Sequence, residues 1–399
     1  MNRSATAAAP DLPTRRDEAW RYAPHADLAR LTFGPSGGPT AVPADVAAQI
    51  PELDGPRVVI VNGAVDPALS DLTMTAEGLT ITTLADELDG GSSSPSTGLP
   101  REDDPVDAFD AFNTRFGRDG AVIRVVSGHT ITVPIHVVDL AVPGDDHNTA
   151  STGVVIELGD DCRATVVETR LGGPQEGGAN VRTTITLGDR ATLEHIVLQD
   201  APATQISLNR VEVIQGAAST YRARSFNLGA SYGRIAFHVQ LAGEAAHADL
   251  SGLYFGFGDQ TLDQQIDVVH AAKGCSSRQL FRGVLDDAST GIFSGGIDVR
   301  PGADGTDAEQ ENHNLLLSDR AEADTQPRLE ILADDVACKH GATVGQLDET
   351  ALYYLRSRGI PAGEARGLLI NGFADQVVDD VAFETLRTWI IDRLRRADA

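Results

Sequence analysis

The sequence contains very little lysine, cysteine or aromatic residue. Its only two lysines, Lys273 and Lys339, do not follow a glycine, so the chain lacks the Gly-Lys pair of a phosphate-binding P-loop. The three cysteines lie far apart, which excludes a disulfide framework and favours a reducing compartment. No segment approaches the roughly 18 apolar residues of a membrane span, and the first ten residues lack a signal-peptide pattern. We therefore expect a cytoplasmic protein that does not cross a membrane.

The charge is strongly negative. Acidic residues number 58 and basic residues 32, which gives a formal net charge of −26. Because nucleic acids are bound by clustered lysine and arginine, this charge argues against a nucleic-acid partner. At 399 residues the chain is too long for one ordinary compact core. It predicts two or three domains, or one long repetitive element with appended ends.

The middle of the chain repeats. From about residue 120, short runs rich in β-branched residues follow one another, at 122–126, 131–133, 154–158, 184–187 and 211–214. Glycines at positions 128, 159, 188, 216, 243 and 274 open comparable turns, spaced 27 to 31 residues apart. A repeat of this length that contains only strands predicts one coil of a β-helix, in which each coil is buried against its neighbours.

The two ends differ from this repeat. Residues 17–22 and 104–115 have helical patterns, and residues 90–100 have the composition of a linker. After Asp348 the sequence predicts three helices, the last from about residue 380 to 396. The predicted organisation is a mixed N-terminal region (1–118), a mainly β core (119–347) and a C-terminal helical domain (348–399).

The densest candidate site is residues 334–343. Cys338 and His340 are two residues apart, so on a strand they share one face, where they form a plausible pair of soft metal ligands. A closed metal site needs about four ligands, and a buried cysteine beside a structural histidine explains the same pattern. Other candidates are His313 as a metal ligand, His270 and Cys275 around Lys273, and the adjacent acids at 286–287 and 334–335.

An ordered set of segments resembles the core shared by SufB and SufD, subunits of the SUF iron–sulfur cluster assembly machinery. The matching segments are 18–22 (EAWRY), 282–286 (RGVLD), 291–295 (GIFSG), 314–318 (NLLLS), 327–331 (PRLEI), 334–336 (DDV), 338–345 (CKHGATVG) and 354–360 (YLRSRGI). The chain is more similar to the SufD branch, because Asn312 stands where SufB chains tend to carry a cysteine. Lys339 departs from the family, in which a small serine is common at this position.

The resemblance implies a right-handed parallel β-helix and a non-catalytic scaffold. It implies SufB as partner and SufC as the bound ATPase, so that ATP is held by SufC and not by this chain. His340 is the residue expected to face the assembly site shared with SufB, and Cys338 matches a position of less clear role. Iron or a cluster is expected to be held only transiently. Contact with SufC is expected in the C-terminal domain, at Tyr354, Leu355, Leu369, Phe373, Phe383 and Trp389.

Two other classes of function stay open from the residues alone. A β-helix enzyme acting on carbohydrate predicts a secretion signal and an aromatic-lined groove, yet aromatic residues make up only 5% of the chain. A stand-alone metal-binding homodimer predicts tight metal binding, for which two firm ligands are few. A homodimer formed when SufB is absent is compatible with both the scaffold and the metal-binding hypotheses.

Overall fold

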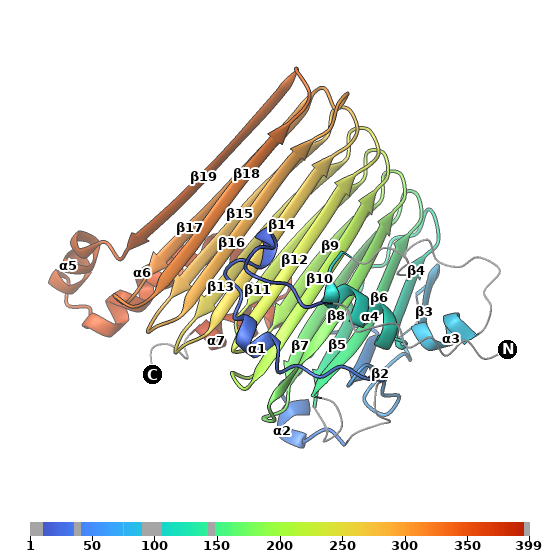
Figure 1. The fold of residues 1–399 in the computed structure, drawn as a ribbon, viewed down its shortest axis with the longest axis horizontal. Helices are drawn as coiled ribbons and strands as arrows, with labels where there is room; N and C mark the ends of the chain where they lie inside the picture. The colour runs from blue at the N-terminus through green and yellow to red at the C-terminus, as the bar shows by residue number, and fades with distance from the viewer. Residues whose placement is uncertain (1–10, 36–40, 75, 90–105, 143–147, 395–399) are drawn as a thin grey trace.

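The computed structural model describes residues 11–35, 41–74, 76–89, 106–142 and 148–394. Within them, strands form a ten-stranded sheet, in the order β19-β17-β15-β13-β11-β9-β7-β5-β1-β2, and a nine-stranded sheet, in the order β18-β16-β14-β12-β10-β8-β6-β4-β3. From β4 onward, strands therefore alternate between the two sheets along the chain, as in a solenoid (Figure 1). The strands are β1 (Arg57–Val61), β2 (Ala64–Val65), β3 (Leu79–Thr83), β4 (Gly120–Val125), β5 (Ile135–Ala141), β6 (Thr149–Leu158), β7 (Arg163–Gly172), β8 (Gly177–Leu187), β9 (Thr192–Gln199), β10 (Gln205–Gln215), β11 (Thr220–Asn227), β12 (Tyr232–Leu241), β13 (His247–Gly256), β14 (Thr261–His270), β15 (Ser276–Leu285), β16 (Thr290–Val299), β17 (Thr306–Leu316), β18 (Glu322–Ile331) and β19 (Val336–Gln346).

Neighbouring coils pair in parallel and in continuous register. Thr220 of β11 pairs with Thr192 of β9 on one side and with His247 of β13 on the other. The predicted glycines lie at one corner of the coils, between a strand of the nine-stranded sheet and the next strand of the ten-stranded sheet. Neighbouring chains approach closely at four of them, Gly159, Gly188, Gly216 and Gly243, and a Cβ on Gly243 would lie 2.1 Å from the backbone nitrogen of Ala217. The predicted parallel β-solenoid is confirmed.

One predicted strand is wrong. Residues 131–133 are not a strand, because Pro134 follows them, and proline lacks the N–H that a sheet ladder needs. The strand of this coil is β5, which begins at Ile135. Ile131 is nevertheless buried in the core, and its backbone N–H donates to the carbonyl of Arg163 at 2.8 Å, beside an isolated parallel bridge between Thr130 and Arg163.

The helices cover the outer faces of both sheets. The C-terminal helices α6 and α7 pack on the ten-stranded sheet, together with the N-terminal helix α2, in one apolar cluster. The N-terminal elements η1, α1 and α4 cover part of the nine-stranded sheet (Figure 1). The helices are η1 (Glu18–Trp20), α1 (His25–Leu28), α2 (Ala44–Ala47), α3 (Leu84–Asp89), α4 (Ala108–Phe116), α5 (Glu349–Ser357), α6 (Ala362–Val378) and α7 (Glu384–Leu394). The predicted linker at 90–100 lies outside the described residues.

The two ends of the solenoid differ. At the first end, strands from the N-terminal region join both sheets: β3 pairs antiparallel with β4, and β2 pairs antiparallel with β1. At the last end, β18 and β19 each pair on one side only within the described chain. We call this last coil, residues 322–346, the open end. Among the described helices, none is long and apolar enough to cross a membrane.

Candidate functional site at the open end of the solenoid

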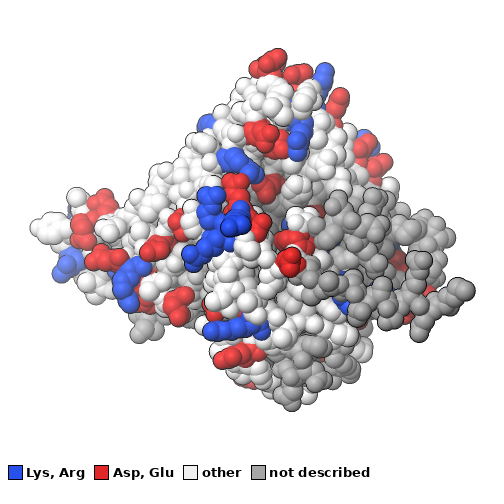
Figure 2. Space-filling view, in the orientation of Figure 1, with Lys and Arg blue, Asp and Glu red and all other residues white. Residues whose placement is uncertain are grey.

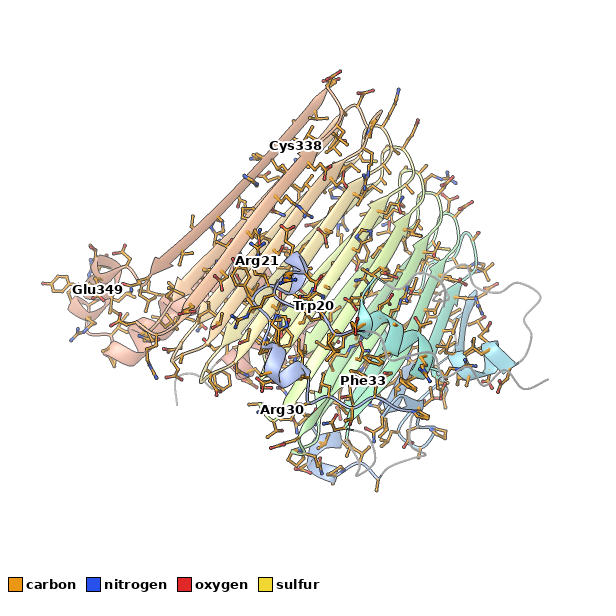
Figure 3. The ribbon with its side chains drawn as sticks, viewed as in Figure 1. Trp20, Arg21, Arg30, Phe33, Cys338 and Glu349 are labelled. Carbon is orange, nitrogen blue, oxygen red and sulfur yellow. The ribbon has the colours of Figure 1, made fainter. Side chains whose placement is uncertain are left out.

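Cys338 and His340 lie on the inward face of β19. Cys338 is in register with Ala308 of β17, and His340 is in register with Gln310. Both β17 residues are fully buried between the two sheets. Because side chains alternate along a strand, the cysteine and the histidine point the same way, as predicted. Figure 3 shows Cys338 on the outermost strand of the ten-stranded sheet, well separated along it from Glu349 of α5.

The thiol of Cys338 is not activated. Its side chain packs in an apolar cluster with Leu329 and Val336 at the end of the solenoid interior. Partial burial raises the pKa of the Cys338 thiol, and the nearby carboxylate of Asp307 acts in the same direction. A raised pKa leaves the group as a neutral thiol at neutral pH, so Cys338 is a poor sulfur nucleophile by itself.

Lys339 faces away from this pair. Its ammonium group lies 2.5 Å from a carboxylate oxygen of Glu309, on the outer face of the ten-stranded sheet. Glu309 also pairs with Arg278 at 3.4 Å. The unusual lysine therefore adds no charge to the inward face that carries Cys338 and His340.

The structure does not bring His313 to the other two candidates. His313 lies on the outer face of β17, where its ring nitrogens contact the Thr343 hydroxyl at 2.8 Å and a Glu311 carboxylate oxygen at 3.3 Å. Cys338 and His340 face the opposite side of the same sheet. Within the described residues, no group of three or more His, Cys, Asp or Glu side chains is placed to hold a metal ion.

The other candidate residues have structural surroundings. His270 is buried, its ring contacts the Ser277 hydroxyl at 2.9 Å, and burial lowers its pKa to about 4, so it is neutral at pH 7. Cys275 is buried in the core, where burial raises the pKa of its thiol. Asp286 pairs with Arg366 of α6 at 3.0 Å. None of these groups lies on the strand that carries the candidate pair.

A polar floor, which the sequence analysis missed, lies directly below the open end. Asn312 donates to the Tyr254 hydroxyl at 2.9 Å, Tyr254 donates to Asn314, and Asn314 donates back to Asn312 at 2.7 Å. In the same strand, the Gln310 amide donates to Gln279 at 2.7 Å. Every residue from Glu309 to Asn314 is polar, so the sequence of β17 does not show which of its faces is buried.

Deeper in the solenoid lies a second polar cluster without a sequence signal. Glu168 is fully buried and pairs with Arg170, and it contacts a ring nitrogen of His195 at 2.7 Å. Burial alone would raise the pKa of Glu168, but Arg170 and His195 outweigh it and hold the pKa at about 2. The carboxylate is therefore charged and paired, which indicates a structural role.

The predicted contact residues of the C-terminal domain divide into two groups. Tyr354 is 56% exposed on α5, beside Tyr353 at 75% exposed, and no residue of α5 is buried. Leu355 and Leu369 are half-buried. Figure 1 shows α5 and the start of α6 beyond the ends of the strands.

The remaining three predicted contacts pack on the solenoid. Phe373, Phe383 and Trp389 belong to the apolar cluster on the outer face of the ten-stranded sheet. The Trp389 ring nitrogen donates to the carbonyl of Gln49 at 3.1 Å, and the Arg282 guanidinium lies over the Phe373 ring at 4.6 Å. These side chains attach the helices to the core, so little of their surface is free for a partner.

A groove of about 810 Å³ lies elsewhere, between the N-terminal segment and the outer face of the nine-stranded sheet. It is lined by Trp20, Arg210, His238 and Asp267 among others, and by no residue of β19. In Figure 2, basic and acidic side chains are interspersed on this face and do not separate into one sign. The candidate pair at the open end is therefore a surface site and not part of this groove.

The described residues define a parallel β-solenoid protein with a helical C-terminal appendage and a cysteine–histidine pair at its open end. A family model described as "SUF system FeS cluster assembly, SufBD core domain" matches residues 142–373, more than half of the chain. The chain belongs to this family of SUF system iron–sulfur cluster assembly proteins.

Curated relatives agree. The iron–sulfur cluster assembly protein SufD of Escherichia coli is 31% identical over 96% of this chain and 88% of its own length. A SufBD family protein of Synechocystis is 28% identical over 94% of this chain and 85% of its own length. One from Mycobacterium leprae is 28% identical over 96% and 89%. The similarity therefore extends over nearly the whole chain, and the predicted family is confirmed.

Proposed function

We propose that this chain is the SufD-type subunit of a cytoplasmic SUF assembly complex. In this role it is a scaffold without chemistry of its own. It pairs through its open end with a SufB-type subunit and holds a SufC-type ATPase on its C-terminal helices. Iron and the forming cluster are substrates that pass through the shared site, and ATP is bound by the ATPase, because this chain has no P-loop lysine.

The observation that carries the proposal is the uncovered surface of the open end. Ile331, Leu332 and Val344 are 40%, 51% and 48% exposed there, and the edge strands β18 and β19 each lack a neighbour on one side within the described chain. An exposed apolar sheet edge is a hazard that proteins normally cover. The first end of the solenoid is closed by antiparallel strands, so the asymmetry favours a protein partner at the last end only. A homologous solenoid supplies matching strand edges and a matching core.

The position of the candidate pair fits this arrangement. A partner seated on the open end would enclose His340 and the partly buried Cys338 at the contact. The imidazole supplies a nitrogen ligand of the kind that iron accepts. Because the Cys338 thiol has a raised pKa, we assign sulfur mobilisation to the SufB-type subunit. We assign Cys338 and His340 to iron entry or cluster formation.

The C-terminal helices supply a second surface. Tyr353, Tyr354 and Leu368 are exposed, at 75%, 56% and 48%, on the part of the helical domain that projects from the solenoid. Exposed aromatic side chains on a rigid support are typical of protein contact sites. We assign this surface to the ATPase.

The test is anaerobic affinity purification of the tagged chain from its host, followed by native mass determination. We expect one SufB-like and two ATPase subunits with the chain. Val344→Asp is expected to lose the SufB-like subunit and keep an ATPase. Ile214→Asp is the matched control, because Ile214 is 49% exposed but lies on the outer face of β10. A lone chain, or a homodimer without ATPase, would contradict the proposal and leave the metal-binding homodimer as the alternative.

A further inference from the structure

An amide pair below His340 has one unused donor and one unused acceptor. Gln310 is 0% exposed and Gln279 is 2% exposed. The amide nitrogen of Gln310 donates to the side-chain oxygen of Gln279 at 2.7 Å. This bond leaves the Gln310 side-chain oxygen and the Gln279 amide nitrogen buried and without a partner in the described part of the chain. Such groups are rare in native structures, and each needs a physical reason.

The surroundings of Gln310 restrict which group can satisfy its oxygen. The end of its side chain lies against Gly295 of the facing sheet, where a Cβ would come within 2.2 Å of the Gln310 amide nitrogen. In the last coil, Gly295 is in register with Pro327, and Gln310 is in register with His340. Proline has no N–H to donate. The side chain in register directly above Gln310 is that of His340, whose ring N–H is able to donate.

A competing hydroxyl donor lies in the same coil. The Thr325 hydroxyl lies two residues before Pro327 on β18, and its oxygen is likewise buried without a partner in the described residues. It is in register with Phe293, whereas His340 is in register with Gln310 itself. Register thus favours the histidine, and Thr325 provides the control.

We propose that Gln310 is a positioning residue for His340. In the structure His340 is exposed, and no hydrogen bond joins its ring to the Gln310 oxygen. When the ring turns inward over Gln310, this oxygen accepts a hydrogen bond from one ring nitrogen and so selects a single tautomer of the neutral imidazole. The other ring nitrogen then carries the lone pair and is directed toward the open end. Histidines that bind metals are oriented in this way by an acceptor on the far nitrogen. What this second ring nitrogen binds rests on the proposed function. The hydrogen bond between His340 and Gln310 does not.

The test is the tautomer ratio of His340 in the full chain without partners. The chain is labelled with 15N-histidine, and the His340 signals are assigned by their loss in His340→Ala. The shifts of the two ring nitrogens at pH 8 then give the ratio. Gln310→Met keeps the side-chain length and removes the acceptor, so we expect the ratio to move about fivefold toward that of free histidine, the change expected for one ordinary hydrogen bond. Gln310→Glu keeps an acceptor oxygen and is expected to retain the wild-type preference.

The controls separate this role from general packing. Thr325→Val is expected to leave the ratio unchanged. If Gln310→Met fails to fold, Gln310→Asn withdraws the carbonyl by one carbon and gives the same readout. An unchanged ratio in the folded Met or Asn variant, or a change in Thr325→Val instead, would overturn the inference.

The experiment does not depend on the proposed function. A selected tautomer that Gln310→Met abolishes supports the inference even if no SufB-like subunit copurifies with the chain. Conversely, a complete complex whose His340 tautomer ignores Gln310 overturns the inference and leaves the scaffold proposal standing. Where both hold, the Gln310→Met complex is expected to form several-fold less cluster with unchanged subunit composition.

Discussion

The guanidinium carbon of Arg234 lies 3.9 Å from the ring centre of Trp20, and this contact joins the N-terminal segment to the outer face of the nine-stranded sheet. The same guanidinium donates to the backbone carbonyl of Ala19 at 2.8 Å and to Asp263 at 2.5 Å. Arg234 and Asp263 are 6% and 1% exposed. The N-terminal segment, seen over the middle strands in Figure 3, is therefore held by Arg234, which a buried ion pair with Asp263 fixes in place.

This geometry predicts that Asp263→Ala is strongly destabilising. The substitution leaves the Arg234 guanidinium buried without its carboxylate, which costs about 3–5 kcal/mol of unfolding free energy. Thermal unfolding followed by circular dichroism measures the loss. The double variant Arg234→Met/Asp263→Leu removes both charges and is expected to lose less than Asp263→Ala alone. If Asp263→Ala were as stable as the wild type, the Arg234–Asp263 pair would be solvated and not buried.

Two buried histidines predict that stability falls in mild acid. Burial lowers the pKa of His136 to about 3 and that of His270 to about 4, both below the ordinary value near 6.5. Since the unfolded chain takes up protons from pH 6.5 downward and the folded chain does not, stability falls as the pH falls through this window toward the folded pKa values. The melting temperature should therefore drop between pH 7 and pH 5.

A variant isolates this effect. His270→Gln removes one of the two groups, so its melting temperature should depend less steeply on pH between 6.5 and 5 than that of the wild type. The comparison uses the slope and not the absolute stability, because the substitution also changes core packing. Equal slopes in the two proteins would mean that His270 is protonated in the folded state.

Substitution of Lys339 is expected to have no effect, although Lys339 is next to His340 in the sequence. Because its ammonium group pairs with Glu309 on the outer face of the sheet, Lys339→Ser should leave both the melting temperature and cluster formation unchanged. The measurement is cluster yield in the assembled complex. A large loss of cluster in Lys339→Ser would mean that the charge acts on the inward pair after all.

Two different changes in the C-terminal helices are expected to weaken ATPase binding. Deletion of residues 380–399 removes α7, whose Arg393 lies 2.5 Å from Asp200 of the solenoid, and should weaken ATPase binding by loosening α6. Tyr354→Ala should weaken binding as well but leave the melting temperature unchanged, because Tyr354 is exposed. Binding is measured by pull-down with the ATPase. Unchanged affinity in both variants would place the contact elsewhere.

Much of the fold was predictable because its causes are local and repeated. The β-branched runs and the regular glycines determine strands and corners in each coil, and the strand–helix change between Gln346 and Glu349 follows from helix signals around Asp348. Pairing between coils then follows from the constant repeat length. The prediction at 131–133 was wrong because burial and strand pairing leave the same apolar pattern in a short segment.

The candidate site was predictable only in part. The spacing of Cys338 and His340 predicted a shared face, which the register confirms. The polar floor of Gln310, Asn312 and Asn314 was not predictable, because its partners Gln279 and Tyr254 come from earlier coils. Alternation along one strand cannot distinguish an exposed polar face from a buried face whose partners lie one or two repeats away.

The measurement that tests the central claim most directly is cluster formation by the assembled complex carrying His340→Ala. Anaerobic reconstitution with iron and a sulfur donor is followed by absorbance and by iron content per complex, after native mass has confirmed that all subunits are present. His313→Ala is the matched control, because His313 lies on the opposite face of the same sheet. We expect several-fold less cluster with His340→Ala and wild-type amounts with His313→Ala. Normal cluster formation by an intact His340→Ala complex would contradict this expectation.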